Sequence, residues 1–247
     1  MKKILFLLTL GLSVVSIQAQ KHEETKATLK EPVLVTPGEN NEAPSDAIVL
    51  YRGKQDLTNW VHGEAGKLSE KGEPVKWKAG KILTIVPKTG GIRTVRSFGD
   101  IQLHIEWRTP EKITDNGQAR GNSGIFFMGE YELQVLDSWN NETYYDGQAG
   151  AIYKQYAPLV NASLPPGKWQ TYDVIFTAPK FNEDKTLKSP AYITVIHNGI
   201  LIQNHVEIKG STYVETTEYK FHADKLPLML QDHWYPVSYR NIWIREL

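Results

Sequence analysis

The chain has 247 residues, with 28 lysine and arginine side chains balanced by 28 aspartate and glutamate side chains, and it has no cysteine. Zero net charge argues against a protein that depends on a nucleic-acid backbone or an anionic membrane surface for its affinity. The lack of cysteine excludes disulfides, thiolate metal sites, iron–sulfur clusters and cysteine nucleophiles. The length allows one large domain, and β-sandwiches commonly fill about 200–250 residues as a single domain.

The first twenty residues have the pattern of a secretory signal peptide. Lys2 and Lys3 supply positive charge, residues 4–15 form an apolar run, and small residues surround Ala19, where a signal peptidase can cut. The apolar run is shorter than the roughly 20 residues that span a bilayer. We therefore expect a protein exported to the periplasm or the medium, with no membrane insertion once residues 1–20 are removed.

A polar segment follows the signal-like region. Residues 21–45 are charged, contain proline and show no sustained apolar period, which is typical of a leader or linker. The composition changes at residue 46, and we expect one folded domain over residues 46–247. The oligomeric state does not follow from the sequence.

From residue 46 onward the pattern is that of β-strands. Short runs rich in β-branched and aromatic residues are separated by Gly, Pro, Asn and Asp, and Asn198-Gly199 between two alternating runs indicates a hairpin. No stretch sustains apolar residues at helical spacing with caps at both ends. The pattern favours an antiparallel sandwich or jelly roll. The expected strands are 47–51, 81–86, 101–107, 124–128, 131–136, 171–176, 192–203 (a hairpin), 226–230 and 241–247.

Alternation within two of these runs predicts polar faces. In residues 101–108 and 131–136 the odd positions are apolar, and most even positions are polar or ionisable. Successive strand residues point to opposite faces, so each run has a core face and a polar face, although a solvent-facing outer sheet would give the same alternation. A hairpin-like link through residues 122–124 would join the two polar faces. We therefore expect four side chains on one face: Glu106, Arg108, Glu132 and Gln134.

A second concentration of functional groups lies near the C-terminus. Residues 231–234 offer an amide, a carboxylate, an imidazole and an indole in succession, shortly before Pro236. A surface loop rarely needs all four groups at once. The segment therefore predicts part of a functional site, and a polar corner satisfied by its own hydrogen bonds is the alternative.

Six segments carry characteristic motifs in a specific order over nearly all of residues 46–247. They are LYRGKQDLTNW (50–60), TVRSFGDIQLHIEWR (94–108), GNSGIFFMGEYELQVLDS (121–138), the segment 144–176, ITVIHNGILIQ (193–203) and LQDHWYPVSYRNIWIREL (230–247). Their order and density resemble those of the 3-keto-disaccharide hydrolase family, secreted proteins of glycan-degrading bacteria formerly grouped as a domain of unknown function. Trp234 departs from the expected pattern, in which many relatives have glycine, and an indole there would narrow or line the pocket.

The resemblance implies a fold and a reaction. The fold is a concanavalin A-like jelly roll, an all-β sandwich of two antiparallel sheets with a carbohydrate site on its concave face. The reaction acts on glycosides whose sugar is oxidised at carbon 3, because the ketone acidifies the hydrogen on carbon 2. Loss of that hydrogen gives an enolate that expels the glycosidic oxygen, after which water can add. This chemistry requires a base, a stabiliser for the enolate oxygen and an acid.

Side-chain type and strand face select the candidate residues for this reaction. We expect His233 and Glu132 to be the base and the acid, with Glu106 as a third candidate. Arg108 either stabilises the enolate or pairs with Glu106 or Glu132 as structure. The candidates for substrate binding are amides and a carboxylate for sugar hydroxyls (Asn122, Gln134, Asp137, Gln231) and rings that stack on a sugar (Tyr153, Trp139, Trp234). Asp137 has an alternative role, capping the turn after its strand.

Two other functions fit the same residues. A conventional glycosidase uses two carboxyl groups about 5–5.5 Å apart for retention or about 6.5–9.5 Å apart for inversion, and Glu106 with Glu132 is the alternative pair. A non-catalytic carbohydrate-binding module is the competing class, because this fold also supports lectins. In each case the expected partner is a carbohydrate, with no nucleic acid and no membrane.

No cofactor is predicted, and the site is expected to work without a metal. A divalent metal is the alternative, since four side chains have suitable ligand atoms, but no close-spaced ligand motif appears. Glycine-rich phosphate loops and nucleotide fingerprints are also absent. The four candidate ligands are His104, Glu106, Asp137 and His233.

Overall fold

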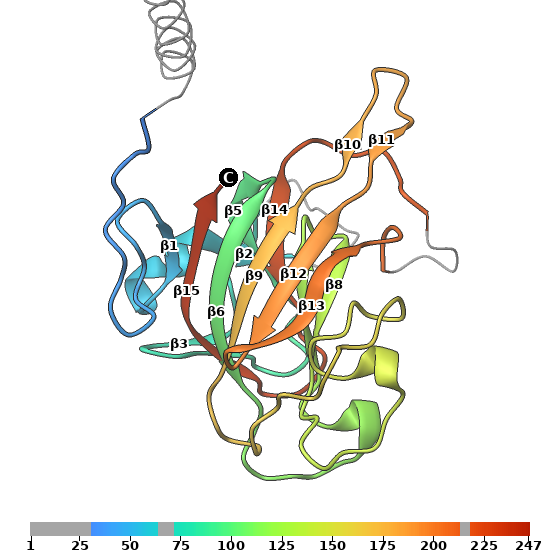
Figure 1. Ribbon diagram of the computed structural model, residues 1–247. Coiled ribbons are helices and arrows are strands. Elements are labelled where there is room, and N and C mark those ends of the chain that lie inside the picture. The colour runs from blue at the N-terminus through green and yellow to red at the C-terminus, as the bar shows by residue number, and fades with distance from the viewer. Residues whose placement is uncertain (1–30, 64–71, 213–217) are drawn as a thin grey trace, which may run out of the picture. The chain divides into compact units, whose positions relative to one another are not determined.

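The computed structural model describes residues 31–63, 72–212 and 218–247, and within these ranges it contains strands and short 3-10 helices but no α-helix (Figure 1). The chain divides into two compact units, residues 1–36 and 37–247, and every strand of the described residues lies in the second. In the described part of the chain, no helix is long and apolar enough to cross a membrane.

The signal-like region and the linker that follows it both stay predictions. Residues 1–20 lie outside the described residues, so export stays a prediction. The linker was predicted to end at residue 45, whereas the compact unit already begins at Pro37. The carbonyl of Asn41 accepts hydrogen bonds from the side chains of Asn241 and Trp243, at 2.9 and 3.1 Å. These contacts tie Asn41 to the distant end of the chain, and the domain boundary at residue 45 stays a prediction.

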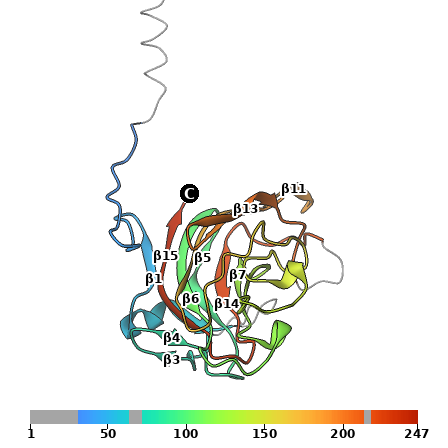
Figure 2. The same ribbon diagram turned by 60° about the horizontal axis from the view of Figure 1, so that its bottom comes forward.

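The second unit is a sandwich of two antiparallel sheets (Figures 1 and 2). The larger sheet has the order β13, β12, β9, β6, β15, β4, β3, with β1 also paired to β15, and the smaller sheet has the order β2, β5, β14, β7, β8. The larger sheet consists of β1 (Ile48–Tyr51), β3 (Lys78–Ala79), β4 (Leu83–Thr84), β6 (Ile101–Arg108), β9 (Gln170–Thr177), β12 (Tyr192–His197), β13 (Ile200–Glu207) and β15 (Ser238–Glu246). The smaller sheet consists of β2 (Trp60–His62), β5 (Ile92–Phe98), β7 (Ser123–Phe127), β8 (Tyr131–Val135) and β14 (Leu226–Leu230). The other described elements are the ribbon β10 (Lys180–Phe181) and β11 (Leu187–Ser189), and the 3-10 helices η1 (Lys54–Asn59), η2 (Gly117–Ala119) and η3 (Tyr145–Gly147).

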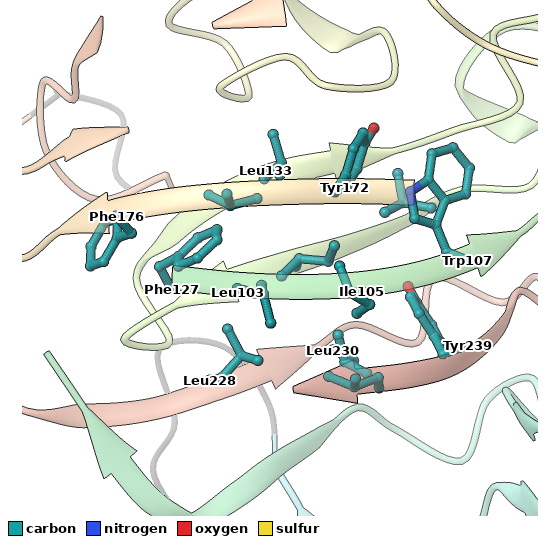
Figure 3. Packing of buried hydrophobic residues seen from close by; sticks show 14 of the residues in the cluster. Leu103, Ile105, Trp107, Phe127, Leu133, Tyr172, Phe176, Leu228, Leu230 and Tyr239 are labelled. Carbon is teal, nitrogen blue, oxygen red and sulfur yellow. The ribbon is translucent and has the colours of Figure 1, made fainter. Parts of the chain in front are cut away.

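The core lies between the two sheets and takes alternate side chains from each. Leu103 and Ile105 of β6 point inward and are fully buried, and Phe127 of the smaller sheet packs on Phe176 of the larger, with ring centroids 4.8 Å apart (Figure 3). Burying one such side chain stabilises a protein by about 1.5–3 kcal/mol. Since alternate residues face the core, the residues between them point outward, one set from each sheet.

The predicted all-β jelly-roll sandwich is confirmed, and all the predicted strands have counterparts in the structure. Asn198 and Gly199 join β12 to β13 with φ of 52° and 80°, as a two-residue hairpin turn with positive φ at both positions requires. Strand β5 was not predicted, although it lies inside the smaller sheet. A register shift against β14 between Pro227 and Met229 interrupts its pattern, so its alternation is weak in the sequence.

The predicted single polar face was wrong. Strand β6, with Glu106 and Arg108, lies in the larger sheet between β9 and β15, whereas β8, with Glu132 and Gln134, lies at the other sheet's edge beside β7. The chain leaves β6 and crosses to the other sheet before residues 122–124, so these residues do not form a hairpin between β6 and β8. Both polar sets point away from the core and therefore lie on opposite outer faces of the sandwich.

On the outer face of the larger sheet, Glu106 belongs to a hydrogen-bonded ion-pair network. Its carboxylate accepts hydrogen bonds from Arg240 Nε at 2.6 Å and Asn241 Nδ2 at 2.9 Å. Burial alone raises the pKa of Glu106, but the hydrogen bonds from His104, Asn241 and Arg240 outweigh it and lower the pKa to about 2. Glu106 is therefore charged at neutral pH and poorly suited to donate a proton there, and its catalytic role stays a prediction.

Arg108 lies on the same outer face, where its guanidinium group packs 4.7 Å from the ring centre of Trp169. Arg240 packs on the same indole at 4.1 Å. Arg240, and not Arg108, pairs with Glu106, so the predicted structural pairing of Arg108 with Glu106 or Glu132 was wrong. Arg108 and Glu132 point outward from different sheets, and the role of Arg108 in stabilising an enolate stays a prediction.

The protonation of His104 gives the folded domain a testable pH dependence. Burial lowers the pKa of His104, but its hydrogen bonds to Asp173 (2.7 Å) and Glu106 outweigh this effect and raise the pKa to about 9 from 6.5. Such a group stabilises the fold fully below pH 6.5 and loses its contribution as the pH rises through 9. We expect the free energy of unfolding in urea to fall by about 1–3 kcal/mol over this range. The variant His104→Gln should show a smaller fall in the free energy of unfolding over this range. An equal fall in the variant and the wild type would contradict a charged His104.

Candidate functional site

The outer face of the smaller sheet carries a row of aligned side chains that ends at Glu132. The register places Arg93 of β5 beside Met229 of β14, Met229 beside Phe126 of β7, and Phe126 beside Glu132 of β8. Residues paired across strands point to the same side of a sheet. On the open side of β8 the segment with Tyr153 lies alongside through an isolated bridge, and the amide of Tyr153 donates to the carbonyl of Glu132 at 3.2 Å. Glu132 is therefore covered by neighbours on both sides.

Glu132 is a buried acid without a counterion. The residue is 4% exposed, and within the described residues its carboxyl group has no hydrogen bond and no ion pair. Burial raises its pKa to about 8, so the carboxyl group is mostly protonated at neutral pH. Ionisable groups perturbed in this way are concentrated at functional sites, because a structural role gains nothing from an unpaired buried acid.

Gly124 provides the space for this carboxyl group. A Cβ atom on Gly124 would lie 2.5 Å from Oε1 of Glu132 and 2.7 Å from the ring of Phe126. The amide of Gln231 donates to the carbonyl of Gly124 at 2.9 Å. Glu132 and the first residue of the loop after β14 therefore flank the same glycine, and the missing side chain leaves room between them.

Two tyrosines border the site. The hydroxyl oxygens of Tyr144 and Tyr153 are 2.7 Å apart, and the ammonium group of Lys154 lies 3.1 Å from the ring centre of Tyr144. Burial, the hydrogen bond to Tyr153 and the nearby charges of Asp146 and Glu132 raise the pKa of Tyr144. Tyr153 thus lies at the site as expected, although its stacking on a sugar stays a prediction.

Asn122 and Gln134 lie on this face but are held by internal contacts. Gln118 joins them, because its carbonyl accepts from Asn122 Nδ2 (2.9 Å) and its Oε1 accepts from Gln134 Nε2 (3.2 Å). Gln118 also donates to the hydroxyl of Thr143 at 2.9 Å. These amides fix the loops around η2 and η3 beside the site. Their contact with sugar hydroxyls stays a prediction.

Asp137 has the turn-capping role that was the alternative to sugar binding. Its carboxylate accepts from Arg120 Nε at 2.7 Å and from the amide of Trp139 at 3.2 Å, and the residue is 2% exposed. A pocket of about 240 Å³ lies beside this ion pair, with Ile113 and Tyr235 in its lining. None of the candidate catalytic residues lines that pocket, so the cavity and the buried acid are separate features.

The loop after β14 is anchored by Asp232. Its carboxylate accepts hydrogen bonds from the backbone amides of Thr89 (2.8 Å), Gly90 (3.0 Å) and Trp234 (2.8 Å). Trp234 has a φ of 71°, in the left-handed region that glycine adopts without strain, and its side chain is largely exposed. The backbone thus explains why glycine would suit this position, and the structure holds an indole there at the surface.

His233 lies on this loop, two residues after Gln231. Its ring is nearly parallel to that of Tyr235, with centroids 6.5 Å apart, and among the described residues its buried Nδ1 has no hydrogen-bond partner. Because Gln231 is bonded to Gly124, the loop begins next to Glu132. Within the described residues His233 and Glu132 make no direct contact with each other.

The predicted site residues thus divide between two faces. Glu132 and Gln231 flank Gly124, and Tyr153 lies beside Glu132, whereas Glu106 and Arg108 lie on the larger sheet. Among the described residues no group of three His, Asp or Glu side chains is placed to hold a metal ion. The four suggested metal ligands are therefore not one cluster.

Sequence reasoning missed residues whose roles depend on distant contacts. These are Gly124, Gln118, Tyr144 and the anchoring function of Asp232. A glycine at an outward position of a strand was the available signal for Gly124. For Gln118 and Tyr144 no local pattern distinguishes them from other loop residues.

Comparison with known proteins identifies the family. Residues 46–245 match the model of the 3-keto-alpha-glucoside-1,2-lyase-like domain, and the chain belongs to this family. This confirms the resemblance found in the sequence. Among curated proteins none matches the chain.

Solved structures of three proteins from Parabacteroides distasonis are similar to the chain, and each was provisionally assigned as a glycosyl hydrolase. One is 46% identical, with a TM-score of 0.82 over 92% of this chain and 96% of its own. The second is 20% identical, with a TM-score of 0.59 over 88% of this chain and 100% of its own. The third is 18% identical, with a TM-score of 0.51 over 80% and 98%. The last two show the fold alone, and the first supports a carbohydrate-active family.

The space over Gly124 can be tested by filling it. In Gly124→Ala the new Cβ would lie 2.5 Å from the Glu132 carboxyl group, so the flexible end of Glu132 must move. A displacement of about 1 Å in a catalytic group can cost about 100-fold in rate, and we expect a loss of this order in kcat/KM for glycoside cleavage. Gly80→Ala is the matched control, since its nearest neighbour atom is 4.0 Å away. Wild-type activity in Gly124→Ala would contradict the importance of this space.

The cost of burying Glu132 can be measured without a substrate. Its pKa is about 8 in the folded protein and 4.5 in its ordinary state, so the wild type loses stability as the pH rises from 4.5 through 8. Glu132→Gln stays neutral, and its stability relative to the wild type should rise by about 1–3 kcal/mol over this range. Urea unfolding at both ends of the range measures the change, with the exposed Glu183→Gln as control. A pH-independent difference would show that Glu132 has an ordinary pKa.

Proposed function

We propose that this member of the 3-keto-alpha-glucoside-1,2-lyase-like domain family is an enzyme that cleaves the glycosidic bond of a 3-keto-glycoside by elimination. Family membership supports a carbohydrate substrate and glycoside-cleaving chemistry. The observation that supports the finer assignment is the protonated, buried Glu132 with no counterion. A neutral acid in a buried site can donate a proton or hydrogen bond to an oxygen that gains negative charge, which elimination requires.

The chemistry starts at carbon 2 of the oxidised sugar. A base removes the proton, and the electron pair of the broken C–H bond forms a double bond to carbon 3, whose ketone oxygen becomes an enolate oxygen. When the ketone re-forms, the double bond moves to carbons 1 and 2. The bond from carbon 1 to the glycosidic oxygen then breaks, and the departing oxygen takes the electron pair and a proton. Later addition of water would give the hydrolysis product.

Within this proposal His233 is the base and Glu132 the acid. His233 has a buried ring nitrogen without a partner among the described residues, which leaves it available to accept a proton when the imidazole is neutral. Gln231 adjoins Glu132 through Gly124 and is the candidate for a sugar hydroxyl. Trp234 and Tyr153 are the candidates for stacking on the sugar ring, since one is exposed and the other faces the acid.

The two competing functions have less support. A glycosidase pair needs carboxyl groups within about 10 Å of each other. Glu106 and Glu132 point outward from two different sheets whose layers are about 10 Å apart, so their carboxyl groups lie farther apart than this mechanism allows. Glu106 is also already paired with Arg240. A binding module would gain nothing from a buried acid without a partner, because such a group costs stability and recognises no neutral sugar better than an amide would.

Export from the cytoplasm belongs to this proposal. The basic end, apolar run and small residues of residues 1–20 support it. An exported enzyme of this kind would meet glycans or their oxidised fragments outside the cytoplasm. Fractionation of cells that express the full chain, followed by N-terminal sequencing of the recovered protein, would test this part.

The reaction itself can be tested by presenting a 3-keto-glucoside and its unoxidised parent to the purified protein. We expect cleavage of the keto compound and not of the parent, since only the ketone acidifies carbon 2. Glu132→Ala and His233→Ala should each lower kcat/KM by about 10²–10⁴-fold, the usual contribution of a general acid or base. Glu183→Ala, an exposed glutamate between β10 and β11, is the control.

Three outcomes would contradict parts of this proposal. Cleavage of the parent glycoside at an equal rate would exclude the keto-dependent mechanism. Binding of the keto compound without turnover would make the protein a carbohydrate-binding module. Undiminished activity in both alanine variants would remove their assigned roles. A parallel assay with a chelator would show whether a divalent metal takes part, through loss of activity that added metal restores.

A further inference from the structure

The hydroxyl groups of Tyr144 and Tyr153 form a pair beside Glu132. Their oxygens are 2.7 Å apart, and among the described residues neither hydroxyl has a second hydrogen-bond partner. In such a pair one proton lies between the two oxygens, so the other proton remains available to a third acceptor. The pair is therefore a hydrogen-bond donor without an acceptor in the protein itself.

The backbone places this donor on the same face as the acid. Leu133 and Ile152 form an antiparallel bridge, and both belong to the core. Their neighbours Glu132 and Tyr153 therefore point to the opposite side of the sheet, and the amide of Tyr153 donates to the carbonyl of Glu132. Side chains directly opposite each other on antiparallel strands start about 4.5–5.5 Å apart at Cβ. The acid and the phenol thus line one small area.

Tyr144 is held in position from several directions. The ammonium group of Lys154 lies 3.1 Å from its ring centre and 3.8 Å from the carboxylate of Asp146. Gly147 packs so closely against the ring that no Cβ could be accommodated there. Lys154 itself has a φ of 61°, a conformation that costs energy for a residue other than glycine. The ring is therefore fixed, and a positive charge lies on its face.

Two neutral donors and a nearby cation suit an anionic oxygen. A protonated carboxyl group donates one hydrogen bond and the tyrosine pair donates another, while neither repels a negative charge. Donors fixed in position stabilise a charge that develops during the reaction more than they stabilise the neutral reactant, because they need no reorganisation. Glu132 is buried here, and the tyrosine pair lies at the exposed rim beside it. A carboxylic acid kept neutral by an apolar site can serve in this way.

We propose that the Glu132 carboxyl group and the Tyr144–Tyr153 pair together bind the oxygen on carbon 3 of the substrate and stabilise the enolate. This inference rests on the proposed elimination and specifies which oxygen the acid serves. As the base takes the proton from carbon 2, the C–H electron pair forms the carbon 2–carbon 3 double bond and the ketone's π electrons move onto its oxygen. Both donors then hold that oxygen until the ketone re-forms. The glycosidic bond breaks at that point, and the departing oxygen takes the electron pair and the proton that the base removed from carbon 2.

The test separates the enolate from the departing group. NMR measures how fast the carbon 2 hydrogen of a 3-keto-glucoside exchanges with solvent deuterium. This exchange reports enolate formation whether or not the glycosidic bond breaks. Cleavage is measured in parallel on methyl and 4-nitrophenyl 3-keto-glucosides, whose leaving groups differ in their need for a proton. The variants are Glu132→Gln, Glu132→Ala, Tyr153→Phe and Tyr144→Phe, with Tyr145→Phe as the control because Tyr145 is exposed on the same turn. Near-ultraviolet circular dichroism checks that each variant is folded.

We expect Tyr153→Phe, Tyr144→Phe and Glu132→Ala to slow exchange by about 10²–10³-fold, the usual effect of removing one such donor. Cleavage of both glycosides should fall by the same factor as exchange. Glu132→Gln keeps a donor and should retain more activity than Glu132→Ala, and Tyr145→Phe should match the wild type.

The alternatives give different results. Losses confined to the methyl glycoside would assign Glu132 to the leaving group and overturn the inference. Normal exchange in both tyrosine variants would also overturn it, even if cleavage by the wild type is established. Exchange that depends on these residues without any cleavage would support the enolate site and contradict the proposed function. A wild type that shows neither exchange nor cleavage would overturn both.

Discussion

Burial of one carboxyl group without a counterion is the constraint on which the candidate site depends. Taking an ionisable group out of water penalises its charged form, so Glu132 stays protonated at a pH where exposed glutamates are charged. Gly124 leaves the space that the group needs, and the segment with Tyr153 alongside β8 covers it. The surrounding amides and tyrosines then satisfy one another and leave the acid unpaired. The sandwich stabilises this arrangement through its apolar core, which is separate from the site.

The two outer faces show how environment decides the chemistry of one residue type. Glu106 and Glu132 occupy equivalent outward positions on strands of opposite sheets, and both are buried. Glu106 has a pKa of about 2 because Arg240, Asn241 and His104 surround it, whereas Glu132 has a pKa of about 8 because burial acts alone. The first is a charged part of a structural network. The second can exchange a proton near neutral pH.

Much of the fold and part of the site could be predicted from the sequence. Strands such as β6 and β8 alternate cleanly, so their inward and outward residues follow from a period of two. Alternation does not say which sheet a strand joins, and so Glu106 and Arg108 were wrongly placed beside Glu132. Gly124 contributes by lacking a side chain, and Gln118 and Tyr144 act through partners about 16 and nine residues away. Such roles depend on how the chain crosses between sheets, which no local pattern encodes.

The contacts of Asn41 have a consequence for which face of the sandwich the start of the folded unit belongs to. Asn41 is bonded to Asn241 and Trp243, and the ring of Trp243 stacks on His104, on the outer face of the larger sheet. Glu132 and its neighbours occupy the outer face of the other sheet. Asn41, near the start of the folded unit, therefore lies on the side of the sandwich away from the candidate site. A change at Asn41 therefore disturbs the stacking around His104 and not the surroundings of Glu132.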